Sequence, residues 1–282
     1  MAQERRHTHI QRQHGHDSVE AGMMDTDETA SASLRCHHFL SDSPKNTINL
    51  AQYIFQCQSD SAFKVCAKHP NLSCMSPSPC LHVSYFQDFV PRLKDHLLSR
   101  LLNNKYDGDE QEFTSEERNT VHFVNNLNWV VQPKHFQINY MTYDIRHEQD
   151  TLHPGHGAFI MMLSREHGSG AHPFWYTQVL RALLIPVNHC GMSKMMEVLW
   201  VRWFVVVPGH QWGIKKAHLP KIGFIPDSSG AFGFLDPSLV LRACHLIPAF
   251  AEGRTDSLLP HGPSIAREDG SLDDWTVYYV NM

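Results

Sequence analysis

The sequence predicts a mainly β fold: a small β-barrel preceded by an amphipathic helix and a disordered N-terminal tail. Residues 172–204 contain two long strand-like runs, HPFWYTQVLRALLIPV and MEVLWVRWF. They are joined by a polar turn, residues 188–193, that contains a glycine. In MEVLWVRWFV both alternating faces are apolar, which is typical of a strand covered on both sides. Short strand-like segments separated by turn residues lie on either side of this pair, as in barrels and sandwiches. We therefore expect the core to close around residues 172–204.

The composition limits the classes of function. With 282 residues and 42% hydrophobic side chains, the simplest expectation is one folded domain with extensions, and two small domains are the alternative. A formal net charge of -5 makes the whole chain a poor sequence-independent DNA binder, so contact with nucleic acid would have to be local. The apolar run VLWVRWFVVV is about half the length of a membrane-spanning helix and contains Arg202, so no membrane association is expected.

Cysteine usage predicts an intracellular, reducing compartment. The 7 cysteines are irregularly spaced and odd in number, which disfavours a disulfide framework. The first residues, MAQERRHTHIQRQHGHD, are polar and charged and do not form a secretory signal. Cys66, Cys74 and Cys80 are separated by gaps that do not match the paired spacing of a zinc site. No metal or other cofactor is therefore assigned.

The N-terminal part is predicted to contain little structure. Residues 1–35 are too polar to bury a core and are expected to form a disordered tail. Residues 36–64 are a short helical lead-in, in which Asn46 or Thr47 is expected to cap a helix. Residues 65–87 have no helical or strand period and are predicted to be a disordered insert. Four tail histidines invite a metal interpretation, but a solvated tail is preferred because no rigid frame holds them: His7, His9, His14 and His16.

A helical segment is predicted over residues 88–118. Phe89, Leu93 and Leu97 share one face of an amphipathic helix, and Pro91 suits its first turn. Thr114 and the glutamate three positions later fit a capping box, which predicts a short second helix.

Residues 119–282 are predicted to form the β-barrel-like domain. We expect a hairpin over 120–131, strands at 135–146 and 158–163, and a strand–turn–strand over 223–237. After Asp236, a good helix cap, SLVLRA is expected to form a short helix. Because the last strand, WTVYYVNM, meets the chain end without a terminator, the domain is predicted to be truncated there.

No catalytic constellation emerges from the residues. Asp144 with Glu148 would suit paired acids, but their surroundings indicate a solvated face. Cys244 and His245 are adjacent in a strand and should point in opposite directions, which does not suit a nucleophile and its base. No GxSxG, HExxH, GxGxxG or Walker pattern is present, and no small-molecule substrate is identified.

One electrostatic feature predicts a binding surface. From residue 198 to residue 226 the chain has no Asp or Glu, while basic and aromatic residues are interleaved. Such interleaving can bind nucleic acid or an acidic tail; the alternative is a core strand followed by a basic surface loop. We also expect Arg202, which interrupts an apolar face, to reach the rim of the barrel or to meet an acid. The candidate binding residues are Arg202, Lys215, Lys216, Lys221 and Trp212.

Several long words of the sequence occur together in a known group of proteins. LWVRWF, GFIPDSSGAFGFLDPSLVLRACHLIPAFAEGRT and DDWTVYYVNM, with PRLKDHLLSRLL and INYMTYDIR, resemble a large group of uncharacterised fungal proteins. That group is similar to the C-terminal region of proteins encoded by Plavaka/CACTA-type DNA transposons. The resemblance covers residues 36–282 and implies descent from a transposable element, work in the nucleus and a role outside the transposase core. It transfers no catalytic residue.

Two further expectations come from resemblance. WYTQVLRALLIPV followed by EVLWVRWF is similar to BAH and Tudor-type small barrels, which bind chromatin tails or other proteins. Members of the fungal group run from a segment like SDSAFK directly into one like DFVPRLKDHLL, so residues 65–87 are interpreted as a possible translated intron.

The sequence therefore leaves three hypotheses about function. The first is a non-catalytic accessory module of transposon origin that binds chromatin, DNA or a transposase-related protein. The second is a fragment of a metal-dependent nuclease or hydrolase whose acidic residues are not recognisable in the sequence. The third is a decayed gene product without activity.

Overall fold

A computed structural model of the chain describes residues 38–39, 45–49, 89–106, 111–123, 129–141, 147–155, 157–166, 168, 171–228, 230–260, 264–267 and 271–281. The predicted tail at 1–35, the predicted insert at 65–87 and most of the lead-in at 36–64 lie outside these residues.

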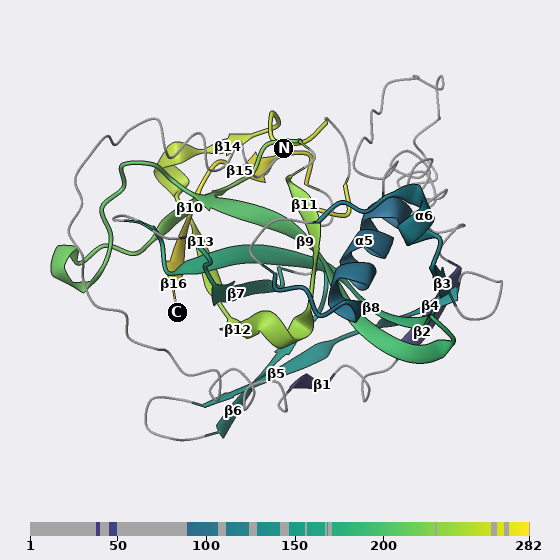
Figure 1. Ribbon diagram of the computed structural model, residues 1–282. Helices are drawn as coiled ribbons and strands as arrows, with labels where there is room; N and C mark the ends of the chain where they lie inside the picture. The colour runs from purple at the N-terminus through teal and green to yellow at the C-terminus, as the bar shows by residue number, and fades with distance from the viewer. Residues whose placement is uncertain are drawn as a thin grey trace, which may run out of the picture.

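A long hairpin organises the fold, as the sequence predicted. Strands β8 (Phe174–His189) and β9 (Met192–Val206) cross the centre of the molecule side by side (Figure 1). Cys190 and Gly191 connect them with φ of 50° and 78°. Two successive positive φ angles are characteristic of the type I′ turn, whose twist matches that of the strands it joins.

Shorter strands pair with both outer edges of this hairpin. β7 (Phe159–Leu163), β4 (Trp129–Pro133) and β3 (Val121–Phe123) all pair with β8. β11 (Phe232–Leu235) and β10 (Lys221–Phe224) both pair with β9.

These pairings correct the hairpin predicted over 120–131. β3 and β4 are both antiparallel to β8, so they run in the same direction and do not pair with each other. The edge of β8 is long enough to accept them one after the other. The strand–turn–strand predicted over 223–237 is present, with Ala231 N donating to Ser228 O at the turn, and its two strands likewise pair in succession with β9.

One continuous stretch of chain, residues 240–248, supplies the strands at both ends of the strand order of the large sheet. β12 (Val240–Ala243) pairs with β7 at one end of the order, and β13 (His245–Pro248) pairs with β16 (Tyr278–Asn281) at the other. Cys244 alone separates β12 from β13, and its N–H donates to Phe159 O over 3.0 Å. The part of the chain that the structure describes is therefore mainly β.

Two smaller sheets are separate from this one. β5 (Phe136–Met141) and β6 (His147–Leu152) form a hairpin that also pairs with β1 (His38–Phe39). β14 (Arg254–Thr255) pairs with β15 (Asp274–Trp275).

Two predicted helical segments were wrong. Residues expected to cap a helix form strand β2 (Lys45–Asn49), which pairs with β4 from Lys45↔Pro133 to Asn49↔Trp129. The rest of that predicted helix lies outside the described residues. After Asp236, whose Oδ1 accepts from Ser238 N as predicted, the helix is a 3₁₀ turn of three residues, η3 (Pro237–Leu239). Pairing with a sheet edge overrode weak local helix preference at both places.

The predicted helices of the 88–118 segment are present. In α5 (Phe89–Leu101), Phe89, Leu93 and Leu97 are buried against the sheet, as expected. The Phe89 ring meets Trp200 edge-on, with centroids 5.1 Å apart. α6 (Ser115–Arg118) has the predicted capping box. No helix among the described residues is both long and apolar enough to span a membrane.

The core is closed on both faces of β9, as predicted. Val198 and Trp200 belong to a cluster that includes α5, whereas Leu199, Val201 and Trp203 belong to a cluster with β7 and β12. A third cluster contains aromatic and aliphatic residues from β7, β8, β9, β10 and β16. Its rings include Phe204 and Phe224, stacked at 4.1 Å.

Candidate partner-binding surface

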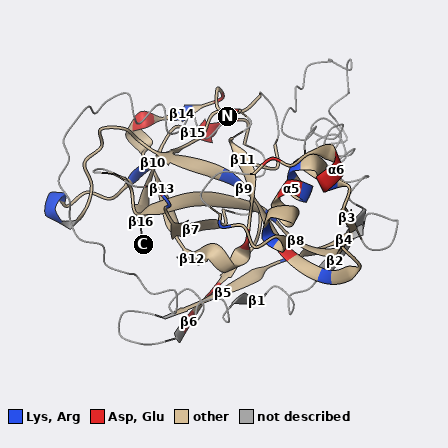
Figure 2. Ribbon diagram, viewed as in Figure 1, with Lys and Arg blue, Asp and Glu red and all other residues tan. Residues whose placement is uncertain are grey.

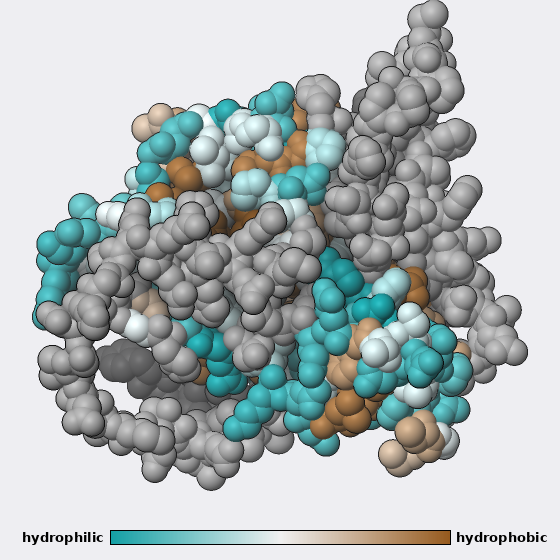
Figure 3. Space-filling model, turned by 45° about the horizontal axis from the view of Figure 1, so that its top comes forward, coloured by the Kyte–Doolittle hydropathy of each residue, from teal (hydrophilic) through white to brown (hydrophobic). Residues whose placement is uncertain are grey.

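The predicted binding residues gather mainly on the loop that joins β9 to β10. This loop, residues 207–220, is held at its base by Val207 N, which donates to Lys221 O over 2.9 Å. Further out, Gly213 N donates to His218 O over 2.9 Å and encloses the 3₁₀ turn η2 (Ile214–Lys216). Gly213 has a φ of 106°, which disfavours a side chain at this position. The loop projects from the sheet at the left of Figure 1 and lies at the hydrophilic left edge of Figure 3.

Lys215 and Lys216 occupy the outer end of the loop. Both side chains are exposed, and η2 is the blue turn at the far left of Figure 2. Neither lysine forms an ion pair with another described residue. Two adjacent, exposed ammonium groups therefore lie on a turn that is held by hydrogen bonds.

Trp212 anchors the loop to the beginning of β8. Its ring lies 4.3 Å from the His172 ring, centroid to centroid, at an interplanar angle of 39°. His172 is buried and also contacts Tyr176 at 5.4 Å, and burial lowers the pKa of its imidazole. A neutral ring thus packs on the indole, and Trp212 remains partly exposed beside the lysines.

Two histidines brace the loop from within. His210 and His218 lie with ring centroids 5.9 Å apart, and each contacts a carbonyl of the same loop: Leu219 O at 3.0 Å and Gln211 O at 3.2 Å. These contacts and the glycine-enclosed turn give the lysine pair a defined position.

Lys221, the third predicted lysine, is neutralised. Its Nζ lies 2.6 Å from Glu252 Oε1, and its side chain is 14% exposed. Although residues 198–226 contain no acid, the fold brings Glu252 to Lys221 from outside that segment. The sequence contained no signal for this pairing, because the two residues are 31 positions apart.

Arg202 does not belong to the predicted surface. Its side chain is 0% exposed, and its Nη1 donates to Asp274 Oδ1 over 2.9 Å. The guanidinium also stacks on Phe224, 3.6 Å from the ring centroid. The expectation that Arg202 meets an acid is confirmed. Because its side chain is fully buried and also donates to Ala266 O, Arg202 is not available to a partner on this surface. Burial lowers the pKa of Arg202, and Asp274 opposes this effect.

The residues considered for catalysis are not brought together. Asp144 lies outside the described residues, and Glu148 accepts a hydrogen bond from the Tyr140 hydroxyl over 3.1 Å. Cys244 is buried, which raises the pKa of its thiol to about 12, while His245 is exposed. Within the described ranges, no three His, Cys, Asp or Glu side chains cluster as a metal site would require.

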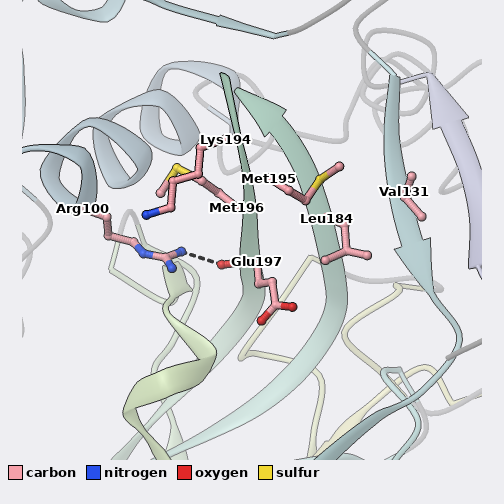
Figure 4. A pocket seen from close by; sticks show the side chains of 7 residues that line it. All are labelled: Arg100, Val131, Leu184, Lys194, Met195, Met196 and Glu197. Carbon is pink, nitrogen blue, oxygen red and sulfur yellow. Dashed lines mark hydrogen bonds between the residues drawn. The ribbon is translucent and has the colours of Figure 1, made fainter. Parts of the chain in front are cut away.

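A groove that the sequence did not predict lies beside α5. It has a volume of about 470 Å³ and lies between α5, β4 and the turn end of the β8–β9 hairpin (Figure 4). Arg100 reaches across one side, where it donates to Glu197 O and pairs with Asp236 through its Nε at 2.9 Å. Met195, which is 55% exposed, and Leu184 supply apolar walls. The methionine-rich run MSKMM, of which Met195 and Met196 line the groove, was the available signal in the sequence.

Comparisons with known proteins add no relative. Neither a protein-family model, nor a curated protein sequence, nor a solved structure matches the chain.

Proposed function

We propose that this protein is a non-catalytic accessory module that binds an acidic protein segment through the loop at residues 207–220. The observation that carries the proposal is the exposed Lys215–Lys216 pair on a turn braced by hydrogen bonds and anchored through Trp212. Lysine ammonium groups attract carboxylates, and a partly exposed indole offers apolar contact beside them.

The charge balance favours an acidic protein segment over DNA. Of the four predicted cations, Arg202 and Lys221 are already paired with Asp274 and Glu252. Duplex DNA binding relies on many phosphate contacts, and two lysines on a chain of formal net charge -5 supply few of them. An acidic tail, by contrast, can be bound by a few basic side chains at one place on the surface.

The proposal also concerns the fold: the strands of this protein form a small barrel of the BAH or Tudor type. In its support, β12 and β13 belong to one stretch of chain and pair with opposite ends of the strand order. The cluster that contains Phe204, Phe224 and Tyr278 is also what the interior of such a barrel would require. In this arrangement the loop at residues 207–220 would lie at the mouth of the barrel.

The origin and cellular location of the protein are proposed from the sequence segments that resemble the fungal group. LWVRWF and the other matching segments support descent from the C-terminal region of a Plavaka/CACTA-type transposon protein. A nuclear location and a chromatin- or transposase-associated acidic partner follow from that origin.

Fluorescence anisotropy on the full chain tests the binding proposal. The probes are a labelled peptide of alternating glutamate and serine, a single-stranded oligonucleotide and a duplex, at one moderate salt concentration. We expect the peptide to bind and Lys215→Gln/Lys216→Gln to weaken it by about tenfold, since two exposed charge contacts are lost. Trp212→Ala should weaken it similarly through loss of apolar contact.

A matched variant separates this loop from general charge. Lys105→Gln/Lys194→Gln removes two exposed lysines elsewhere and should leave peptide binding unchanged. Failure of the native protein to bind the peptide, or an equal loss in both double variants, would contradict the proposal. Preferential binding of either oligonucleotide would favour a nucleic-acid module instead.

A further inference from the structure

A second, polar pocket lies where the β5–β6 hairpin meets β8, away from the loop at residues 207–220. Its volume is about 370 Å³, and its walls come from three separate stretches of chain. The lining residues are Gln132, Pro133, Lys134, His153, Pro154 and Arg181. An ammonium, a guanidinium and an imidazole therefore face a common space, and no carboxylate is among the residues that line it.

Strand register brings these side chains together. β4 pairs with β8 at Val131↔Leu184, and the same antiparallel register carried on for three residues brings Lys134 level with Arg181. β5 pairs with β6 at Phe136↔Leu152, so the next residue on each side places His135 opposite His153. The rings of those two histidines are 5.7 Å apart.

A β-bulge directs Arg181 into this junction. The pairing of β8 with β9 changes register between Val179 and Arg181, which makes Leu180 the extra residue. A bulge turns neighbouring side chains away from the regular alternation, and bulges are frequent beside binding sites. Arg181 Nη1 donates to the Leu180 carbonyl over 2.7 Å, which fixes the guanidinium close to the strand.

The loop after β6 is attached to the same bulge. Gly155 N donates to Val179 O over 3.0 Å, and Val179 N donates to Ala158 O over 2.7 Å. Gly155 has a φ of 82°, and a Cβ at this position would lie 2.8 Å from Arg181 Nη1. The absence of a side chain thus lets the loop backbone, and His153 with it, approach the guanidinium.

From this geometry we propose that the pocket binds the phosphate group of a small molecule. The lining offers a guanidinium, an ammonium, an imidazole and an amide as hydrogen-bond donors and contains no carboxylate, which suits an anionic ligand. Arginine presents several donors in a rigid fork that matches phosphate oxygens. The pocket volume lies within the range of about 300–1,000 Å³ that is usual for small-molecule sites.

Calorimetric titration of the full chain tests this site. Inorganic phosphate and phenyl phosphate are the two phosphate probes, and acetate is the planar control. We expect both phosphate probes to bind more tightly than acetate, and the tighter of them identifies a free or an esterified phosphate as the ligand. Lys134→Gln and Arg181→Gln should each weaken phosphate binding by about tenfold, because each removes a hydrogen bond from a charged donor.

Two further variants, with a check that each is folded, distinguish a loss of phosphate binding from a loss of folding. Arg181→Lys retains the charge but not the fork and should give an intermediate loss, whereas Lys105→Gln/Lys194→Gln, at two exposed lysines outside this pocket, should leave phosphate binding unchanged. Circular dichroism and the melting temperature of each variant establish that it is folded. Absence of phosphate binding, unchanged affinity in Lys134→Gln, or equal affinity for acetate would overturn the proposal. An oligonucleotide without terminal phosphate groups is the last probe. If it displaces bound phosphate, the assignment to a small molecule is overturned.

Discussion

The carboxylate of Asp274 pairs with the buried guanidinium of Arg202, with Oδ1 2.9 Å from Nη1. Arg267 approaches the other oxygen, Oδ2, through its Nε at 3.2 Å. One carboxylate thus serves two arginines whose side chains are 0% exposed. Since Arg202 lies on β9 and its partners lie after β14, this cluster attaches the C-terminal part of the chain to the central hairpin.

Replacing Asp274 should destabilise the fold strongly. Asp274→Ala would leave two buried guanidinium groups without their carboxylate, and breaking a buried ion pair from one side costs about 3–5 kcal/mol. We expect a loss of that size in the free energy of unfolding, measured by urea denaturation.

The preceding residue provides the matched control. Asp273 forms an ion pair with Arg254 at 2.7 Å, but the two side chains are 44% and 33% exposed. Asp273→Ala should therefore cost no more than about 1 kcal/mol. Equal effects of the two substitutions would show that the Asp274 cluster does not stabilise the fold as described.

Phe89 should account for much of the docking of α5. Its ring is 2% exposed and contacts Trp200 and Phe234 at centroid distances of 5.1 Å and 5.0 Å. Phe89→Ala is expected to cost about 3–5 kcal/mol in the free energy of unfolding, because a cavity replaces the ring. Leu102→Ala, at a side chain that is 51% exposed, should change stability by about 0.5 kcal/mol or less. A small loss at Phe89 would contradict the packing of α5 on the sheet.

His96 should make stability depend on pH. Burial beside Phe234, together with the nearby charge of Arg100, lowers its pKa from 6.5 to about 3. Above pH 6.5 the imidazole is neutral in both the folded and the unfolded chain, so it adds no pH dependence. Between these two values the unfolded chain takes up a proton that the folded chain does not, so stability falls as the pH falls, by about 1.4 kcal/mol per pH unit.

Urea denaturation of the native protein and of His96→Leu, carried out from pH 7 down to about pH 4, measures this contribution. The variant should lose stability less steeply with falling pH, because its side chain has no proton to exchange. Parallel curves for the two proteins would show that His96 takes up its proton as readily in the folded chain as in the unfolded chain, and would contradict a lowered pKa.

The two described cysteines should differ sharply in reactivity. Cys190 is exposed at the β8–β9 turn, and its Sγ lies 3.4 Å from His189 Nε2. Cys244 is buried, which raises the pKa of its thiol to about 12. Because the thiolate is the reactive form, iodoacetamide at neutral pH should label Cys190 in the folded protein and leave Cys244 unlabelled until urea is added. Peptide mass spectrometry measures both sites, and rapid labelling of Cys244 without urea would contradict its burial.

Local patterns predicted most of the strands that lie near one another in sequence. The hairpin of β8 and β9, the amphipathic α5 and the capping box at Thr114 follow from hydrophobic period and turn chemistry, which act over a few residues. The strand at β2 was mistaken for a helix because its backbone partners on β4 lie 80 to 88 positions away along the chain. Local preference carries no information about such a partner.

The same division applies to the candidate sites. By itself, the sequence determined that Lys215, Lys216 and Trp212 belong to a basic loop, since that loop is one continuous stretch between two strands. Only the tertiary structure decided that Asp274 and Glu252 remove Arg202 and Lys221 from the same surface. It alone also brought Lys134 and Arg181 to one pocket. A charge is neutralised or presented by whichever residues fold against it, and strand register rather than sequence distance decides which residues those are.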